Sequence, residues 1–302
     1  MIPASASAPT TRFAPAPTGR LHLGHLANAI FVWGIARARG GRVLLRIEDH
    51  DRQRCRQEFE AALLDDLDRL GIAADEPSTD GFRAGLSNDR QSDNGPRYAA
   101  ALAQLGAVTD VYACDCSRST FAAFRARQGR PWDGSGCPGG CRERRLPYAA
   151  DRTIRAALGD GEEAWDDIVL GPRSGQLSPD GDLPVRDRNG NWTYALCVVV
   201  DDVRHGVDLV VRGEDLAEAT PAQIRLARLL GRETPPTFAH HPLVRHPDGS
   251  KLSKADGATA IGDLLDRGAT REALFGEAAH RVGLLPTPRP ITFAAALELV
   301  AG

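Results

Sequence analysis

The start of the chain contains a strand, a turn, a helix and a second strand in an order that few folds allow. TRFA at 11–14 has the character of a short strand, and a turn rich in Pro and Gly follows it. From Leu21 onward apolar residues recur at helical spacing until Gly40-Gly41, where the helix is expected to stop. RVLLRI at 42–47 is typical of a buried strand. This order predicts the beginning of a doubly wound α/β sheet with parallel strands.

Later segments continue the alternation of helices and strands. The sequence predicts helices over roughly 56–70, over 96–105 and from Thr220 to Gly231. It predicts strands at 111–114 and 237–244. YALCVVVDD at 194–202 and VDLVVRG at 207–213 are also interpreted as strands, and two short helices are expected at the end of the chain.

The stretch 114–192 differs from its surroundings because it is rich in Gly, Arg, Asp and Pro and holds four of the six cysteines. It is interpreted as an insertion into a nucleotide-binding type of domain. The predicted organisation is a frayed tail at 1–10, a sheet domain formed by 11–113 and 193–256, the insertion at 114–192, and a short helical C-terminal segment at 257–302.

Four cysteines form the pairs Cys114-x-Cys116 and Cys137-x3-Cys141, which 20 residues separate. This spacing suits a tetrahedral zinc ion that is held by four thiolates. Two disulfides, which are disfavoured in a cytosolic chain, and four unlinked cysteines are the alternatives. No acid–base group accompanies the motif, so the expected zinc ion is structural.

Lysine is nearly absent from the chain. Of the 37 basic residues 35 are arginine, and the only two lysines, Lys251 and Lys254, are three positions apart. A lysine ammonium is a compact point charge and an arginine guanidinium is a broad fork, so the two are not equivalent against a phosphate. The lysine pair is therefore interpreted as a functional motif; two residual surface charges in a loop are the alternative.

The first helix begins with His22-Leu23-Gly24-His25. The N-terminus of a helix offers unpaired N–H groups and the positive end of a dipole, which together suit a phosphate group. Gly24 allows a ligand to lie against the backbone, and two histidines at i and i+3 share one helical face. By itself the motif is more typical of an ordinary helix N-terminus that carries two exposed histidines.

Taken together, these motifs resemble the class I aminoacyl-tRNA synthetases. HLGH at 22–25 is similar to the first signature of that family, and KLSKA at 251–255 is similar to the second. In the family the two signatures bracket the triphosphate of ATP, which implies a Rossmann-like catalytic domain. The resemblance implies catalytic roles for His22, His25, Lys251 and Lys254, and ATP contacts from His22, Gly24, His25 and Lys254.

Two further segments resemble the glutamyl branch of this family. RFAPAPTG at 12–19 is similar to the segment R-x-A-P-S-P-T-G, although Ala16 stands where the family usually has Ser. LRIEDHD at 45–51 is similar to the segment R-I-E-D-T-D. The resemblance implies that two arginines bind the carboxylates of glutamate, that an acidic residue binds its ammonium group and that a tyrosine shapes the pocket. The implied glutamate-binding residues are Arg12, Ala14, Ala16, Glu48, Tyr194 and Arg212.

The chemistry of glutamate agrees with this set, because glutamate carries two carboxylates and one ammonium group and arginine binds carboxylates through two parallel hydrogen bonds. Activation needs no protein nucleophile, since a glutamate carboxylate attacks the α-phosphorus of ATP and pyrophosphate leaves. Catalysis then consists of positioning and charge neutralisation, with Mg²⁺ accompanying ATP.

The insertion has a local excess of positive charge, although the whole chain has a net charge of −3. Between 118 and 145 seven arginines stand against two acidic residues. These arginines are Arg118, Arg125, Arg127, Arg130, Arg142, Arg144 and Arg145. They are expected to contact RNA phosphates; a solvated arginine-rich surface is the alternative.

Related synthetases also carry a zinc insertion at this place in the sequence, commonly with a tyrosine at the position of Cys137.

Only 48 residues follow Lys254, whereas a glutamyl-tRNA synthetase has a large helical anticodon-binding region after its second signature. Val198 also stands where glutamyl synthetases tend to carry Asn. From about residue 11 to 300 the chain resembles the glutamyl-Q tRNA(Asp) synthetases, truncated paralogues that activate glutamate without tRNA. They attach it to the queuosine base at the wobble position of tRNA(Asp). The resemblance implies L-glutamate, ATP and queuosine-containing tRNA(Asp) as partners.

Two other functions stay open at this point. One is a glutamyl-tRNA synthetase fragment that charges a tRNA 3′ end, and the other is a non-catalytic zinc protein that binds RNA or a partner. No run of about 18 apolar residues predicts a membrane helix. The start MIPASASAP lacks the basic and apolar regions of a secretory signal. We therefore expect a cytoplasmic monomer without a membrane partner.

Overall fold

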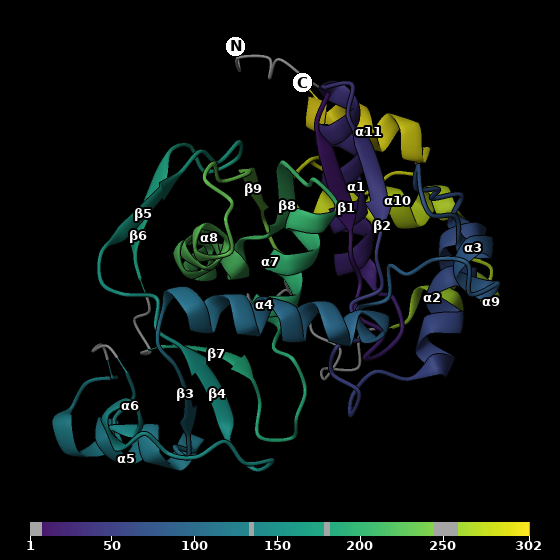
Figure 1. The fold of residues 1–302 in the computed structure, drawn as a ribbon. Helices are drawn as coiled ribbons and strands as arrows, with labels where there is room; N and C mark the ends of the chain where they lie inside the picture. The colour runs from purple at the N-terminus through teal and green to yellow at the C-terminus, as the bar shows by residue number, and fades with distance from the viewer. Residues whose placement is uncertain (1–7, 133–135, 178–181, 245–258, 302) are drawn as a thin grey trace.

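Parallel strands form the centre of the computed structural model, which describes residues 8–132, 136–177, 182–244 and 259–301. Strand β1 (Thr10–Phe13) pairs in parallel with β2 (Arg42–Leu45), and β8 (Leu209–Gly213) pairs in parallel with β9 (Thr237–His241). The two pairs meet where the N–H group of Asp208 donates to the carbonyl of Thr10 at 3.1 Å. The strands therefore lie side by side in the order β2, β1, β8, β9 (Figure 1).

The helix between the first two strands is confirmed as α1 (Leu23–Ala38), and ten of its residues are buried. It ends before Gly40, which has a φ of +67°, and Gly41, where a Cβ atom would lie 2.4 Å from the Pro9 carbonyl. Only glycine avoids that clash between the chain entering β1 and the turn entering β2.

The helices that follow β2 are α2 (Gln57–Leu70) and α3 (Thr79–Arg83). The expected helix over 56–70 is thus confirmed, and its leucine positions 63, 64, 67 and 70 are buried at helical spacing.

Three helices, rather than the expected two, end the described chain: α9 (Ile261–Asp266), α10 (Arg271–Arg281) and α11 (Phe293–Ala301). The last of these crosses α1 so closely that a Cβ atom on Gly34 would lie 2.9 Å from Cβ of Val300. α10 and α11 therefore pack against α1, and α9 packs against α2 (Figure 1).

An inserted lobe lies on the left of Figure 1, with its antiparallel sheet below and its separate hairpin above. Helices η1 (Gln91–Asn94) and α4 (Gly95–Val108) lead into it. Its antiparallel sheet has the order β3, β4, β7, and a separate hairpin pairs β5 with β6. The elements are β3 (Val111–Cys114), α5 (Arg118–Gln128), α6 (Cys141–Arg144), β4 (Thr153–Ala156), β5 (Glu162–Trp165), β6 (Arg173–Gln176) and β7 (Leu183–Arg186).

The strand expected at 194–202 is wrong, because this segment is the helix α7 (Tyr194–Arg204). Its consecutive β-branched residues resemble a strand, but the helix brings Val198 and Asp202 to within about one and two turns of Tyr194 on one side. A strand would spread the same residues over about twice that length. η2 (Glu214–Ala219) and α8 (Thr220–Leu229) follow β8, and the helix expected from Thr220 is confirmed.

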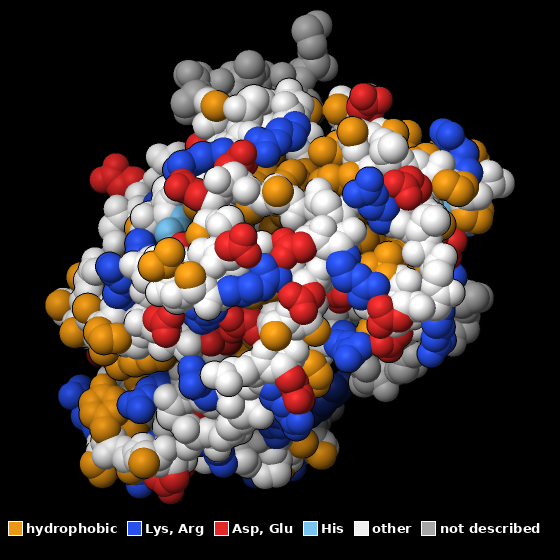
Figure 2. Space-filling model, turned by 90° about the vertical axis from the view of Figure 1, so that its right-hand side faces the viewer, with side chains coloured by type: hydrophobic (Ala, Val, Ile, Leu, Met, Phe, Trp, Pro, Cys, Tyr) orange, Lys and Arg blue, Asp and Glu red, His pale blue; other side chains and the backbone are white. Residues whose placement is uncertain are grey.

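Acidic and basic side chains alternate over the face drawn in Figure 2, without a large field of one sign on that face. Such mixing agrees with the small net charge of the chain. Among the helices of the described residues, none combines the length and the apolar character that crossing a membrane requires.

Candidate active site

A cavity of about 270 Å³ lies where β1 and β8 end and α1 begins. In open parallel sheets ligands bind outside the carboxyl ends of the strands, so this is the expected place for a site. Ala16 lies in the turn after β1 and is not one of the residues that line it, while Lys251 and Lys254 lie outside the described residues. The sequence-predicted residues that line it are Arg12, Ala14, His22, Gly24, His25, Glu48, Tyr194 and Arg212.

The helix tip holds its two histidines through the backbone. Nδ1 of His22 accepts a hydrogen bond from the N–H of Gly24 at 3.1 Å, and Nδ1 of His25 accepts one from the N–H of His22 at 3.1 Å. A neutral imidazole that accepts at Nδ1 carries its proton at Nε2. A Cβ atom on Gly24 would lie 2.9 Å from the His22 ring, so this capping arrangement requires glycine. Both rings can therefore donate from Nε2.

A series of buried ion pairs lies on the side of the cavity that β1 forms. Nε of Arg12 donates to Asp202 at 3.0 Å, and Nη1 of Arg46 donates to the same carboxylate at 2.7 Å. Nη2 of Arg46 then donates to Glu48 at 2.9 Å. Burial acts to raise the pKa of Asp202, but Arg12 and Arg46 lower it below its ordinary value. Asp202 thus stays ionised and orients Arg12 and, through Arg46, Glu48.

Arg212 occupies the opposite side and donates mainly to neutral groups. Its Nε donates to Nε2 of His240 at 3.0 Å, its Nη1 to Gln223 at 2.6 Å and its Nη2 to Thr220 at 2.8 Å. Burial lowers its pKa. Burial also raises the pKa of Tyr194, so this phenol stays neutral. The arrangement presents a buried guanidinium to the cavity.

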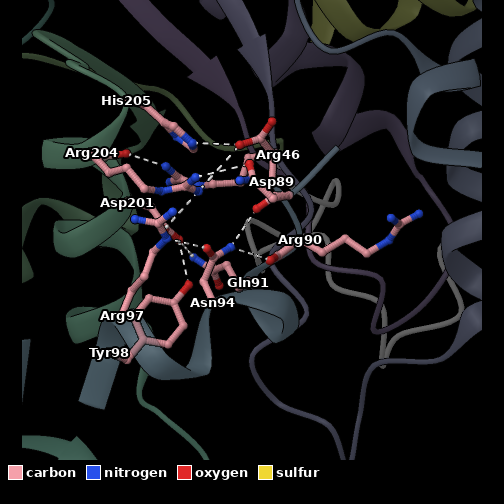
Figure 3. Close-up of polar contacts among 12 residues, drawn as sticks. Arg46, Asp89, Arg90, Gln91, Asn94, Arg97, Tyr98, Asp201, Arg204 and His205 are labelled. Atoms are coloured by element: carbon pink, nitrogen blue, oxygen red, sulfur yellow. Dashed lines mark hydrogen bonds and ion pairs between the residues drawn. The ribbon is translucent and has the colours of Figure 1, made fainter. Parts of the chain in front are cut away.

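A second polar network joins α7 to the segment after α3 (Figure 3). Asp201 accepts hydrogen bonds from the hydroxyl of Tyr98 at 2.8 Å and from Nε2 of Gln91 at 3.1 Å. His205 contacts Asp89 through Nε2 at 2.8 Å. None of these five side chains lines the cavity, so the network holds α7 in place without reaching the site.

Sequence reasoning missed Asp202 and His240, which hold the two arginines, and Asp167, which contacts His240. A signal for Asp202 was present: two adjacent aspartates end an apolar run, and buried carboxylates need cationic partners. No comparable signal marks Asp167 or His240, because neither stands in a motif that the sequence singled out.

A larger cavity of about 1230 Å³ adjoins the first, and Tyr194 and Asp215 line both. The inserted lobe contributes Arg118 and Phe121 from α5 and the region around Arg188. The cavity therefore lies between the lobe and the parallel strands, next to the candidate site.

The four paired cysteines come together. Their Sγ atoms all lie within 4.8 Å of one another, and all four residues are buried. Sγ of Cys116 is 3.5 Å from that of Cys137 and 3.6 Å from that of Cys141, spacings close to those of four thiolates around one metal ion. The hydrogen bond between Cys114 and Cys137 lowers the pKa of Cys114 and raises that of Cys137, and burial raises the pKa of Cys141. The cluster thus fits a metal ion, Cys137 included.

Two of the arginines expected to contact RNA have aspartate partners. Arg142 donates to Asp110 at 2.6 Å, and Arg144 donates to both oxygens of Asp115 at 3.0 and 2.8 Å. These bonds tie α6 to the ends of β3. The basic side chains of α5 are exposed, so the excess of positive charge is concentrated on that helix.

The sequence profile of the catalytic domain of class I tRNA synthetases (E and Q) matches residues 9–290. The chain belongs to this family. The predicted fold of a parallel sheet with helices, with a metal-type cysteine cluster and a helical C-terminal piece, is confirmed. The expected class of enzyme, an aminoacyl-tRNA synthetase-like ligase, is confirmed as well.

Known members of the class I synthetase family support the resemblance to the glutamyl-Q type. A Symbiobacterium thermophilum protein named glutamyl-Q tRNA(Asp) synthetase is 40% identical over 289 residues, which are 93% of this chain and 88% of that protein. A Rhodobacter capsulatus protein of the same name is 40% identical over 280 residues, 86% of this chain and 96% of that protein.

A solved glutamate tRNA ligase from Elizabethkingia meningosepticum has a TM-score of 0.76 and 24% sequence identity to the chain. The match covers 97% of this chain but 64% of the ligase, so the chain spans less than two thirds of that protein. This likeness shows that the fold is shared.

Proposed function

We propose that the chain activates L-glutamate with ATP to glutamyl-adenylate without tRNA and transfers the glutamyl group to the queuosine base at the wobble position of tRNA(Asp). The names of its 40% identical relatives support this reaction. A tRNA substrate also agrees with a cytoplasmic location.

One observation carries the glutamate assignment: a single cavity joins two buried arginines and a glutamate to a histidine-bearing helix tip. Arg12 and Arg212 provide guanidinium groups for two carboxylates, and Glu48 provides a carboxylate for an ammonium group. His22 and His25 provide Nε2–H donors for phosphate oxygens. An acidic amino acid and a nucleotide phosphate complement this set.

In the activation step a carboxylate oxygen of glutamate forms a bond to the α-phosphorus of ATP, and the bond to the β-phosphate bridging oxygen breaks. Pyrophosphate leaves with that electron pair. Arg12, Arg212 and Glu48 hold the nucleophile in place, and His22 and His25 hydrogen-bond the phosphates. Mg²⁺ bound to ATP supplies further charge neutralisation, and Lys251 and Lys254 are proposed to add theirs.

The adjoining cavity is our proposed site for the acceptor nucleoside. It is large enough for a nucleoside, and it offers the ring of Phe121 for stacking and the guanidinium groups of Arg118 and Arg188 for phosphate contacts. Tyr194 and Asp215 belong to both cavities, so an acceptor there would face the activated glutamate.

The test has two parts. Isotope exchange between pyrophosphate and ATP should depend on glutamate and proceed without tRNA; a folded, metal-loaded chain that shows none would refute the activation step. Mass spectrometry of digested tRNA(Asp) should then show a glutamyl mass on the queuosine nucleoside. A glutamyl group on the 3′-terminal adenosine of tRNA(Glu) would replace the proposed acceptor with that of an ordinary glutamyl-tRNA synthetase.

We propose Zn²⁺ as the ion of the cysteine cluster, with a structural role, because four thiolates favour zinc and no acid–base group joins the cluster. Metal analysis should give one zinc per chain in the wild type and a clear loss in Cys116→Ser. Cys55→Ser, which alters a half-buried cysteine outside the cluster, is the matched control. Stoichiometric zinc in Cys116→Ser would contradict the assignment.

We also propose that α5 contacts tRNA phosphates. Arg125 and Arg127 lie on its exposed surface, whereas Arg142 and Arg144 are already engaged with aspartates. Arg125→Glu together with Arg127→Glu should weaken tRNA binding and flatten its dependence on salt by about one unit of slope for each lost contact. An unchanged slope would leave α5 as a solvated surface.

A further inference from the structure

The inserted lobe reaches the edge of the parallel strands at Asp167. The N–H of Ile168 donates to the carbonyl of Phe238 at 2.8 Å, and the N–H of Phe238 donates to the carbonyl of Asp166 at 2.9 Å. These bonds continue the parallel sheet beyond β9. They place Asp167 beside His240, which follows Phe238 by two residues on the same face of β9.

The carboxylate of Asp167 is fully engaged. Its Oδ1 accepts hydrogen bonds from the N–H groups of Val169 and Leu170 at 3.0 Å each and from the N–H of His240 at 3.2 Å. Its Oδ2 contacts Nδ1 of His240, and both side chains are completely buried. The aspartate thus fixes its own turn with one oxygen and the histidine ring with the other.

The partners of His240 determine its tautomer. Arginine can only donate, so the contact between Nε of Arg212 and Nε2 of His240 at 3.0 Å makes Nε2 the acceptor. Nδ1 then carries the proton, which Oδ2 of Asp167 accepts. A reversed tautomer would set an N–H group against the N–H of Arg212.

We propose that Asp167 and His240 are positioning residues that hold Arg212 in the orientation in which it binds a carboxylate of the amino-acid substrate. This inference rests on the proposed function. Neither residue lines the cavity, so both act through Arg212. The affinity for the acidic substrate then depends on an aspartate that the inserted lobe supplies.

Asp167→Asn separates this role from a merely structural one. The asparagine Oδ1 can still accept the three backbone N–H groups, so the turn is kept. Its Nδ2 then faces Nδ1 of His240 as a donor, which favours the wrong tautomer. The KM for glutamate in the exchange reaction should rise about 10- to 100-fold, as for loss of one hydrogen bond to a charged group. The KM for ATP should change less than about two-fold.

Two variants of His240 sharpen the test. His240→Phe removes the acceptor and should match Asp167→Asn. His240→Gln in the Asp167→Asn background offers Arg212 an amide oxygen that depends on no tautomer, so it should recover much of the lost glutamate affinity. A KM for glutamate within about two-fold of wild type in both Asp167→Asn and His240→Phe would overturn the inference, as would an equal rise in the KM for ATP.

Asp89 and His205 form a matched control, because they are a second Asp–His pair whose side chains do not line the cavity (Figure 3). Asp89→Asn should leave the KM for glutamate unchanged. Nitrogen-15 resonances of His240 in the whole chain provide an independent readout: the proton should be on Nδ1 in the wild type and on Nε2 in Asp167→Asn. A wild type without glutamate-dependent exchange would refute the proposed function, and a proton on Nε2 in the wild type would refute this inference.

Discussion

The two arginines of the cavity are equally buried, at 4% exposure each, but are held in opposite ways. Arg12 shares the carboxylate of Asp202 with Arg46, at 3.0 and 2.7 Å. Arg212 donates to a ring nitrogen, an amide oxygen and a hydroxyl, and among the described residues no carboxylate forms an ion pair with it. Among the described residues, one positive charge therefore has a carboxylate in direct contact and the other does not.

The difference assigns separate tasks to the two groups. A buried charge is costly unless it has a partner, so Arg12 and Asp202 depend on each other for stability. Within the described part of the chain Arg212 has no carboxylate in direct contact, so an anion that enters the cavity would supply one. We infer that Arg12 mainly contributes geometry, whereas the charge of Arg212 drives the binding of the acidic substrate.

The largest expected effect is a loss of stability when Asp202, the carboxylate partner of Arg12, is removed. Asp202→Ala leaves Arg12 buried without a carboxylate partner and leaves Arg46 with Glu48 alone, so the free energy of unfolding should fall by about 3–5 kcal/mol. Denaturant titration measures it. Asp263→Ala removes the exposed partner of Arg20 and should change stability by less than about 1 kcal/mol. Equal losses in the two variants would break the comparison.

The second-largest expected effect is a loss of catalytic efficiency when Arg212 is replaced. Arg212→Met removes the charge that faces the substrate, so kcat/KM for glutamate should fall about 30-fold to several thousand-fold. This fall corresponds to a loss of roughly 2–5 kcal/mol in transition-state binding. The free energy of unfolding should change less than in Asp202→Ala, because removal of a buried charge offsets the cost of the acceptors that Arg212 leaves unpaired on His240, Gln223 and Thr220. Exchange kinetics and denaturation on the same sample test both statements; a large loss of stability would contradict them.

Acid should lower the stability of the protein through Asp202, which contacts Arg12, and through Asp167, which contacts Arg212 by way of His240. Burial acts to raise the pKa of Asp167, but the hydrogen bond with His240 and those from backbone N–H groups lower it from 3.8 to about 2. A lowered pKa contributes stability above about pH 4, and that contribution is lost as the pH falls toward about 2. The loss is about 2 kcal/mol for Asp167. Denaturation at pH 5 and pH 3 should show a smaller acid dependence in Asp167→Asn than in the wild type.

The smallest effect concerns a neutral acceptor of Arg212. Thr220→Val keeps the shape but removes the hydroxyl that accepts from Nη2 at 2.8 Å. Loss of one neutral acceptor should raise the KM for glutamate roughly five-fold, about 1 kcal/mol. A change as large as that of Arg212→Met would mean that Thr220 does more than share the hydrogen bonds of the guanidinium.

Contiguous motifs made much of the site predictable. β1, α1 and β2 follow one another in the sequence, so the cavity residues His22, Gly24 and Glu48 could be placed at one end of one sheet before the structure was known. Lys251 and Lys254 lie outside the described residues, so their place beside these residues stays a prediction.

The rest depends on contacts that sequence patterns do not encode. Arg12 and Asp202 are 190 residues apart, and Asp167 and His240 are 73 apart. The misassigned helix α7 hid the first pair, because an extended strand at 194–202 would place Asp202 about twice as far from Tyr194 as two turns of helix do. Tertiary packing overrode the local preference of a β-branched run.

The shared wall of the two cavities has a pharmacological consequence. Because Tyr194 and Asp215 line both, one small molecule can fill the two spaces at once. A bisubstrate inhibitor that joins an acidic amino-acid mimic to a stacking aromatic ring would make its second contact intramolecular. Its potency would then exceed that of either half through effective concentration alone.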